Sequence, residues 1–469
     1  MATSHENPSP SSSSSSVVVV MVPYLAQSHL NQLLQFAHVV SSYNIPVHYV
    51  SSTPQISQVK SRALNPLHQL TKIHFHGYEI PTLPSLPQTT DPCSKTNNPE
   101  DEIRRNKASK HLREPVTALL RSLSPNARRL VVVYDVLMSW VVQDVVSLPN
   151  SECYSFHCVS VSFGLAASQK FNVPIGHFPS LESCYPAFLL DDIASQLKLS
   201  TSDFKAQSVH NSCRAIEGSS IELLANDQSK LNQKIWAVGP LQTTTDSKVL
   251  RDEDKCLLEW LDEQEAKSVL YISFGTVTTL SDEQIKEIAL GLEQSGVKFI
   301  WALRDGDELD DLRNEKEGRR SSQVPDGFEE RMRGMGMGMV VRTWVPQVKI
   351  LEHPSTGGFM SHCGWNSCME SIAMGVPIAT WPMQSDQPFN ALLITRVLKV
   401  GVAVMEWEQR DELVTSSMIS GAVRKIMASE EGDEIRKRAV EMAEAVKRSV
   451  EDGGDCRLEW DSFIAHITR

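Results

Sequence analysis

The sequence predicts an α/β protein built from two doubly wound units in series. Short runs rich in β-branched and aromatic residues alternate with amphipathic helical stretches, and this alternation is typical of parallel sheets whose strands are joined by helices. The pattern occurs in both halves of the 469-residue chain, which is longer than one hydrophobic core usually supports. A hydrophobic content of 41% and a charged content of 22% are ordinary for a folded protein. We therefore expect two domains that meet at a cleft.

The expected strands follow one another along both halves of the chain. In order they are 16–24, 45–52, 73–80, 129–136 and 153–161, then 268–276, 297–304, 338–345, 357–363, 376–382 and 401–407. Ser281 and Gln284 have the spacing of a capping box at the start of a helix. Its apolar positions Ile285, Ile288 and Leu292 then recur with helical period. The segment 434–469 is also helical in pattern.

Changes in composition predict the domain boundaries. We expect a disordered tail, a first domain, a polar linker, a second domain, and a C-terminal helix that returns to the first domain. These correspond to residues 1–16, 17–241, 242–254, 255–450 and 451–469. A charged loop, 305–323, interrupts the second domain.

Charge and cysteine content exclude several classes of function. The net charge of −12 argues against a nucleic-acid or anionic-membrane partner, because both need a basic surface. No run approaches the roughly 20 apolar residues that cross a bilayer. The nine cysteines show no CxxC pair, so neither a disulfide framework nor a zinc site is predicted. We expect a cytoplasmic protein without a bound metal.

The stretch TGGFMSHCGWNSCM, residues 356–369, predicts a phosphate site. A strand ends here and a helix begins, so free backbone amides and the positive end of the helix dipole face a ligand. His362, Asn366 and Ser367 add polar side chains that suit a diphosphate, and Glu370 lies one turn further, where it suits ribose hydroxyls. Each has an ordinary alternative: a core histidine, helix-capping residues and a surface carboxylate.

Flanking residues extend the predicted site. Trp344 offers a flat ring on which a base can stack, with the amide of Gln347 nearby. Asp386 and Gln387 follow another strand and suit sugar hydroxyls. The alternatives are a core tryptophan and a solvated loop.

The 44-residue stretch 344–387 resembles the signature box of plant glycosyltransferases that use UDP-sugars. The resemblance implies a GT-B fold, in which two Rossmann-like domains face each other and the C-terminal one binds the donor. It implies that Trp344 stacks on uracil, that Gln347 contacts the nucleoside and that Glu370 holds the ribose. It also assigns the diphosphate to His362, Asn366 and Ser367 and the sugar to Asp386 and Gln387, with Val345, Trp365, Ser273 and Thr276 as further donor-side residues. The terminal Gln387 favours glucose in this family.

Transfer to an alcohol also needs a base, and the first half of the chain offers one. His29 follows the first strand, and Asp135 ends a later one. Because the ends of neighbouring parallel strands lie close together, the carboxylate could hold one imidazole nitrogen while the other takes the proton. A structural histidine and a capping aspartate are the alternatives. The resemblance supports the catalytic reading, since AQSH after the first strand matches the family's pattern except that Ser28 replaces the usual Gly.

Much of the chain resembles the zeatin O-glucosyltransferases and their xylosyl relatives, in segments such as IPVHYVSS and IHFHGYEIP. The resemblance implies inverting transfer from UDP-glucose, a co-substrate, to a small hydrophobic hydroxylated acceptor, with the side-chain hydroxyl of a zeatin-type cytokinin favoured. Phenolic acceptors and UDP-xylose stay open, and we expect a monomer.

Three rival functions are weaker. No G-x-G-x-x-G of a dehydrogenase follows the first strand. The metal-binding pattern at Asp305 and Asp307 falls in the charged loop. A non-catalytic sugar-nucleotide-binding protein would not need His29 and Asp135.

Overall fold

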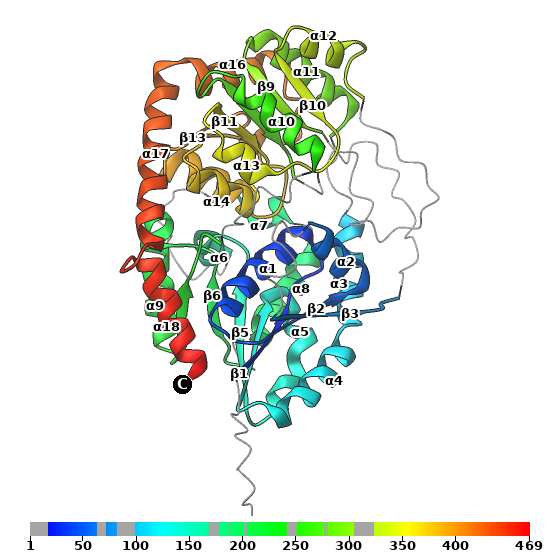
Figure 1. The fold of residues 1–469 in the computed structure, drawn as a ribbon, viewed down its shortest axis with the longest axis vertical. Helices are drawn as coiled ribbons and strands as arrows, with labels where there is room; N and C mark the ends of the chain where they lie inside the picture. Colours follow the sequence, from blue (N-terminus) through cyan, green and yellow to red (C-terminus); the bar gives the residue numbers. More distant parts are fainter. Residues whose placement is uncertain are drawn as a thin grey trace, which may run out of the picture.

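The computed structural model contains two α/β halves, one above the other in Figure 1. It describes residues 17–62, 72–81, 99–167, 178–185, 187–200, 204–241, 251–275, 278, 280–303 and 323–469. The expected tail 1–16, the candidate Thr276 and the Asp305–Asp307 pattern lie outside these residues.

The first half is built on a parallel sheet of seven strands. Its order is β3-β2-β1-β4-β5-β6-β7. The strands are β1 (Val17–Val22), β2 (Val47–Ser52), β3 (Ile73–Tyr78), β4 (Arg129–Asp135), β5 (Ser151–His157), β6 (Gln207–His210) and β7 (Ile235–Ala237). The helices are α1 (Gln27–Ser42), α2 (Thr53–Arg62), α3 (Pro99–Lys110), α4 (Arg113–Leu123), α5 (Ser139–Val142), α6 (Val161–Ala167), α7 (Leu181–Cys184), α8 (Ala187–Lys198) and α9 (Arg214–Ser229). The short strands β6 and β7 were not among the expected ones.

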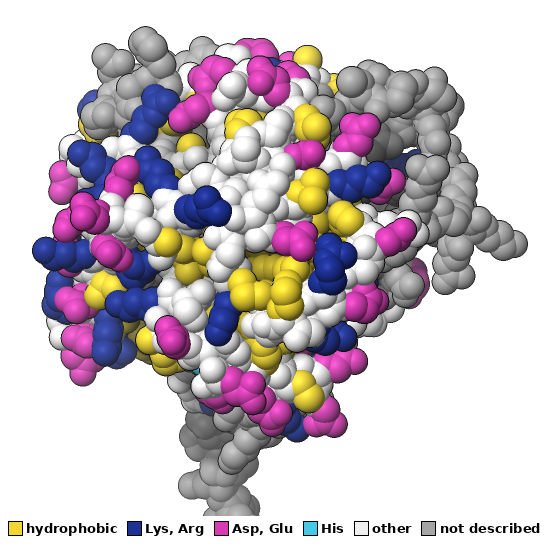
Figure 2. Space-filling view, turned by 90° about the horizontal axis from the view of Figure 1, so that it is seen from above, with side chains coloured by type: hydrophobic (Ala, Val, Ile, Leu, Met, Phe, Trp, Pro, Cys, Tyr) yellow, Lys and Arg dark blue, Asp and Glu magenta, His cyan; other side chains and the backbone are white. Residues whose placement is uncertain are grey.

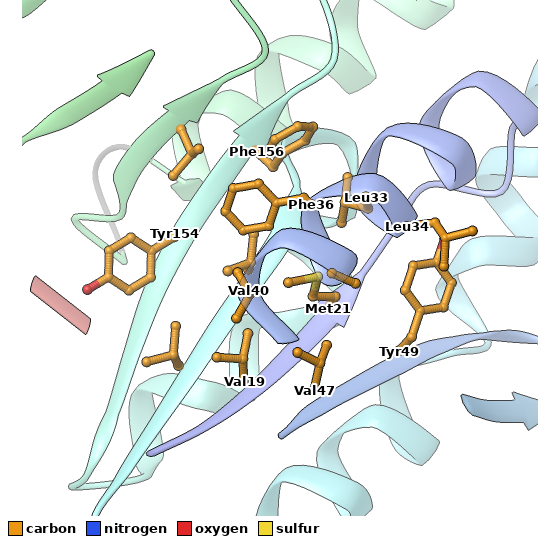
Figure 3. Close-up of a cluster of buried hydrophobic side chains, with 14 of the residues drawn as sticks. Val19, Met21, Leu33, Leu34, Phe36, Val40, Val47, Tyr49, Tyr154 and Phe156 are labelled. Carbon is orange, nitrogen blue, oxygen red and sulfur yellow. The ribbon is translucent and has the colours of Figure 1, made fainter. Parts of the chain in front are cut away.

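Helix α1 covers one face of this sheet. Its buried residues Leu30, Leu33, Leu34 and Ala37 recur at i, i+3, i+4 and i+7, so one apolar stripe faces the strands. Figure 3 shows side chains of α1 against those of β1, β2 and β5.

The second half is built on a parallel sheet of six strands in the order β10-β9-β8-β11-β12-β13. The strands are β8 (Val269–Ser273), β9 (Lys298–Ala302), β10 (Gly338–Val341), β11 (Thr356–Ser361), β12 (Ile378–Thr380) and β13 (Gly401–Ala403). The helices are α10 (Asp252–Asp262), α11 (Asp282–Ser295), α12 (Phe328–Gly334), α13 (Gln347–Glu352), α14 (Trp365–Ala373), α15 (Gln387–Leu392) and α16 (Ser416–Ala428). The two sheets confirm the predicted fold class.

The predicted capping box at α11 is only half formed. The Ser281 hydroxyl accepts a hydrogen bond from the Gln284 backbone N–H, as a cap should. The Gln284 side chain instead binds Val414, donating to its carbonyl and accepting from its N–H. The Gln284 side-chain amide therefore satisfies the buried backbone N–H and C=O of Val414 and does not complete the capping box.

The last two helices connect the halves. Helix α17 (Glu430–Val450) runs along the side of the molecule, and α18 (Asp455–Thr468) lies beside the first half (Figure 1). Trp460, Phe463 and Ile467 of α18 belong to the same buried cluster as α1 and the first sheet. Upstream, α10 begins at Asp252, so the last three residues of the expected linker 242–254 are helical, and residues 242–250 lie outside the described part.

Two further findings concern chemistry and membranes. The eight cysteines in the described part of the chain are free thiols. Among the described helices, none has the length and apolar character needed to cross a bilayer.

Candidate active site

A cavity of about 1150 Å³ lies where the two sheets face each other. It contains residues that follow β1 and β4 in the first sheet, and β8 and β11 in the second. In each sheet the strand order reverses between these two strands. Such a reversal leaves a crevice at the carboxyl ends of the strands, where open α/β sheets bind their ligands. The cavity is therefore the candidate active site.

The predicted site residues lie together in this cavity. Every one that falls within the described residues lines it: His29, Asp135, Ser273, Trp344, Val345, Gln347, His362, Trp365, Asn366, Ser367, Glu370, Asp386 and Gln387.

His29 and Asp135 form a hydrogen-bonded pair. His29 is in the first turn of α1, and its Nδ1 lies 2.6 Å from Oδ2 of Asp135 at the end of β4. The Asp135 side chain is 1% exposed, whereas that of His29 is 20% exposed. The other carboxylate oxygen accepts a hydrogen bond from the Leu137 N–H. The carboxylate is thus fixed and dry, and the imidazole reaches the cavity.

The electrostatics of the pair favour a charged imidazolium. Burial lowers the pKa of His29, but the Asp135 carboxylate and the more distant carboxylates of Glu102 and Asp386 together raise it by more, so the net shift is upward. Burial raises the pKa of Asp135, but the charge and hydrogen bond of His29, with the hydrogen bonds from Leu137 and Cys158, together lower it by more. Asp135 therefore stays ionised beside a base that can accept a proton.

Sequence reasoning missed the side chains that surround this pair. Cys158 donates its S–H to Oδ2 of Asp135 at 3.2 Å. The Tyr24 ring meets the His29 ring edge-on at 5.4 Å, and its hydroxyl donates to Glu102 at 2.6 Å. Cys158 falls inside the expected strand 153–161, whereas β5 ends at His157, so the sequence did not place it at a strand end. Glu102 carries no signal either.

His29, Asp135 and Cys158 also offer three donor atoms within 4.8 Å of one another. These donor types can bind zinc. The thiol, however, is buried beside the Asp135 carboxylate, and both effects raise its pKa well above the usual value. Because a metal needs the thiolate, this arrangement favours the hydrogen-bonded pair.

On the other side of the cavity, Gln347 connects several donor-side residues. Its Nε2 donates to Glu370 Oε2 at 2.6 Å and to Ser367 Oγ at 3.1 Å. Its Oε1 accepts from the Tyr271 hydroxyl at 3.1 Å. Burial raises the pKa of Glu370 to about 7, although the bond from Gln347 acts in the opposite direction. Glu370 is therefore not the surface carboxylate of the alternative interpretation.

The residues at the start of α14 do not cap it with their side chains. Gly364 is the N-cap, and no side chain caps the helix. Asn366 instead donates to the Ser28 carbonyl at 3.1 Å, across to the first half of the chain. Trp365 donates its indole N–H to the Asn211 carbonyl at 2.7 Å and is nearly buried. Its indole thus anchors α14 to the first half, although the residue lines the cavity.

His362 sits between two glycines that leave it room. A Cβ on Gly275 would lie 2.7 Å from its Nε2, and one on Gly364 would lie 2.6 Å away. The φ of Gly364 is −57°, which suits any residue. The absent side chain, rather than the backbone conformation, is what His362 requires.

Asp386 and Gln387 are buried rather than part of a solvated loop. Asp386 accepts from Asn390 at 2.8 Å, and Gln387 accepts from the Met383 and Gln384 N–H groups. Ser385, just before them, has a left-handed φ of 63°. Such strain in a non-glycine residue is held by its surroundings and is common at functional sites.

Trp344 is half-buried at the edge of the cavity rather than in the core. The Arg251 guanidinium lies over its ring, 5.8 Å from the centroid, and also donates to the Trp344 carbonyl. Ser273 ends β8 and is buried at the cavity wall.

Known families match almost the whole chain. A model of "Glycosyltransferase, N-terminal domain" matches residues 15–243, and one of "UDP-glucoronosyl and UDP-glucosyl transferase" matches residues 233–436.

Two bean enzymes are similar over nearly their full length. The chain is 46% identical over 464 residues to a zeatin O-glucosyltransferase of Phaseolus lunatus, covering 96% of each chain. It is also 46% identical over 464 residues to a zeatin O-xylosyltransferase of Phaseolus vulgaris, covering 96% of this chain and 98% of the other.

Among solved structures, Medicago truncatula UGT71G1 complexed with UDP-glucose aligns with a TM-score of 0.76 and 25% identity, covering 97% of this chain and 99% of the other. This likeness and the two parallel sheets confirm the GT-B fold.

Proposed function

Because the chain belongs to the plant UDP-glycosyltransferase family, we propose that it transfers glucose from UDP-glucose to a hydroxyl of a small hydrophobic acceptor. We favour the side-chain hydroxyl of a zeatin-type cytokinin. The observation that carries the proposal is the His29–Asp135 pair at 2.6 Å, in one cavity with the donor-side residues. Asp386 contributes to the raised pKa of His29, which supports a base close to the sugar subsite.

In this proposal the second half of the chain binds the donor. Trp344 stacks on the uracil, and Gln347 contacts the nucleoside. Glu370 accepts hydrogen bonds from the ribose. His362, Asn366 and Ser367, with the first amides of α14 and with Ser273 on the phosphate side, hold the diphosphate. Asp386 and Gln387 bind sugar hydroxyls. No metal takes part.

Transfer is a single displacement. The acceptor oxygen forms a bond to the anomeric carbon as the bond from that carbon to the diphosphate oxygen breaks. The acceptor proton moves to Nε2 of His29, and Asp135 stabilises the resulting imidazolium. UDP leaves with the electron pair of the broken bond, and the configuration at carbon inverts to give a β-glucoside.

The proposed acceptor and the proposed donor sugar are inferred from the similar enzymes. The similar bean enzymes carry zeatin in their names, and they differ in transferring glucose or xylose. Gln387 at the end of the signature box supports glucose. We further propose that the enzyme is a cytoplasmic monomer.

The test is a matrix of UDP-sugars against hydroxylated acceptors, with mass detection of the product. UDP-glucose and UDP-xylose are each paired with trans-zeatin, cis-zeatin, dihydrozeatin and several phenols. We expect a β-O-glucoside of a zeatin from UDP-glucose. A xyloside as the main product would contradict glucose as the donor sugar, and a phenolic glucoside would contradict a zeatin as the acceptor. Binding of UDP-glucose without any product would indicate a non-catalytic sugar-nucleotide-binding protein.

A further inference from the structure

Two neighbouring strands of the first sheet end in the same short pattern. Strand β5 ends with Ser155-Phe156-His157, and β6 ends with Ser208-Val209-His210. The strands pair in parallel so that Ser155 lies opposite Ser208 and His157 opposite His210. Both histidines line the cavity that holds His29. None of the proposed steps uses them.

The two imidazoles are stacked and held alike. Their centroids are 4.3 Å apart, with 12° between the ring planes. Nε2 of His157 lies 3.2 Å from the Ser155 hydroxyl, and Nε2 of His210 lies 3.1 Å from that of Ser208. Each ring is thus fixed through one nitrogen, and its Nδ1 is on the other side of the ring.

Nδ1 of His210 is a buried polar atom in need of a partner. His210 is 5% exposed, and within the described part of the chain its Nδ1 makes no hydrogen bond. A buried polar atom left without a partner costs about 1–3 kcal/mol. A group of the acceptor that reached this atom would remove that cost.

Both rings are neutral at physiological pH. Burial lowers the pKa of His157 to about 4, despite the Asp135 carboxylate nearby. Burial and the neighbouring His157 lower the pKa of His210 well below its usual value. Ser208 donates its hydroxyl proton to Gln228 Oε1 at 3.1 Å, and Ser155 donates its own to the Gln207 carbonyl at 3.4 Å, so each serine accepts from Nε2–H and each Nδ1 presents a lone pair. The pair can therefore accept a hydrogen bond from an N–H group on the edge of a ligand.

The pair lies at the same edge of the sheet as the base. Strands β4, β5 and β6 are neighbours in the sheet, and they end at Asp135, His157 and His210, with strand ends about one spacing of 4.8 Å apart. Asp135 is in register with Phe156, so His157 and His210, one residue further, project from the other face of the sheet. The Asp135 charge still raises the pKa of His157 against the effect of burial, which places the pair near the base across the end of the sheet.

We propose that His157 and His210 recognise the nitrogen-bearing edge of a heteroaromatic acceptor ring whose side-chain hydroxyl reaches His29. A purine-like edge, which carries a ring N–H, matches the Nδ1 lone pair of His210. The inference deepens the proposed function and depends on it for the position of the reacting hydroxyl.

The first experiment compares two acceptors with the wild-type enzyme. One is trans-zeatin, and the other is its analogue in which a benzene ring replaces the purine, with the same side chain and hydroxyl. We expect kcat/KM to be about tenfold higher for the purine, which corresponds to one hydrogen bond to a buried group. A ratio near one would overturn the inference.

The second experiment repeats the comparison with three variants. His210→Leu should bring the ratio close to one while leaving KM for UDP-glucose unchanged. His210→Asn, whose amide can replace Nδ1, should retain part of the ratio. His74→Leu, at an exposed histidine of β3 that does not line the cavity, is the matched control and should behave as wild type. Retention of the full ratio in His210→Leu would count against the proposal.

Binding measurements keep the inference testable apart from catalysis. Titration calorimetry with adenine and with benzene-ring analogues, in the presence of UDP, should show a preference for adenine in the wild type and its loss in His210→Leu. If His210→Leu does not fold, His157→Leu and His210→Asn provide the same comparison. Absence of transfer to every acceptor would contradict the proposed function, whereas transfer or binding without heterocycle preference would contradict this inference alone.

Discussion

At the scale of single residues, the site depends on how two carboxyl groups are buried. Asp135 is kept ionised by hydrogen bonds from three directions, namely His29, Leu137 and Cys158. Glu370 has one bond, from Gln347, against a large desolvation, so its pKa rises to about 7. The same functional group, a carboxyl, thus serves as a fixed charge in one place and as a titrating group in the other.

Replacing the proposed base should remove most of the activity. We expect His29→Ala to lower kcat by at least about 100-fold, because His29 is the imidazole that Asp135 holds at the cavity to take the proton. Asp135→Asn should lose less, because the imidazole remains. Initial rates of UDP release measure both, and circular dichroism checks the fold. Near-wild-type transfer by His29→Ala at neutral pH would show that the base is assigned wrongly.

The pH profile should report the raised pKa of His29. The imidazole must be neutral to accept a proton, so kcat should fall as the pH drops through its pKa, which Asp135 raises above the usual value. In Asp135→Asn this acid limb should move to lower pH, since burial then acts without the opposing charge. Rates at saturating UDP-glucose from pH 5 to 9 measure the limb. A limb that stays in place would contradict the pairing.

Glu370 should make donor binding dependent on pH. Its carboxyl group is protonated below about pH 7, and a protonated carboxyl is a poorer acceptor for ribose hydroxyls. KM for UDP-glucose should therefore rise, by roughly tenfold, as the pH falls from 8 to 6. Glu370→Gln has no charge to titrate, so its KM should be uniformly high and flat across this range. A wild-type KM without pH dependence would argue against contact with the ribose.

At the scale of elements, α18 is part of the first half's core although it ends the chain. The Phe463 ring lies 5.5 Å from Phe36, 5.5 Å from Tyr154 and 5.4 Å from Trp236, between their ring centroids. The Trp460 indole donates to the Val238 carbonyl at 3.0 Å. Helix α18 therefore closes a face of the first sheet beside α1, and α17 spans the distance between the halves (Figure 1).

Truncating the buried face of α18 should destabilise the protein. Phe463 is fully buried, so we expect Phe463→Ala to lower the free energy of unfolding by about 3–5 kcal/mol. Leu458→Ala on the same helix is the control; Leu458 is 55% exposed, and its loss should change stability by less than about 0.5 kcal/mol. Urea unfolding followed by circular dichroism compares them. Equal effects would mean that α18 does not pack as described.

At the scale of the whole molecule, the site exists only where the two halves meet. The Asn366 and Trp365 side chains reach backbone carbonyls of the first half, and Ser385 donates to the Tyr185 hydroxyl at 2.9 Å. On the outer face of the second half, basic and acidic side chains are interspersed rather than gathered into a basic stripe (Figure 2). This surface agrees with the net charge of −12 and with a small-molecule substrate.

Transfer should proceed without a divalent metal. In the proposal the leaving group is stabilised by the first amides of α14 and by hydrogen-bonding side chains, so an excess of EDTA should leave the rate of UDP release unchanged. The measurement compares enzyme dialysed against EDTA with the same enzyme after addition of Mg²⁺ or Mn²⁺. A loss of activity restored by either ion would require a metal in the mechanism.

The sequence by itself determined the class of fold and thirteen of the residues that line the cavity. Eleven of the thirteen strands were predicted in the right order, because β-branched runs and helical periods are local signals. The strands that were missed, β6 and β7, have four and three residues, but β10, β12 and β13 are as short and were predicted, so length alone does not explain the difference. The polar cluster in 356–369 and His29 were found because each lies at a strand end, where ligands of parallel sheets bind, and the full signature box was found by its resemblance to a known family.

Only the tertiary structure decided what each side chain does. Gln284 joins Val414 instead of completing its capping box, the Trp365 indole anchors a helix, and Gly364 makes space for a histidine. Cys158, Glu102 and the His157–His210 pair come to the cavity from separate segments. Hydrogen bonds, burial and shifted pKa values depend on groups far apart in sequence, and their distances exist only once the two sheets have folded and met.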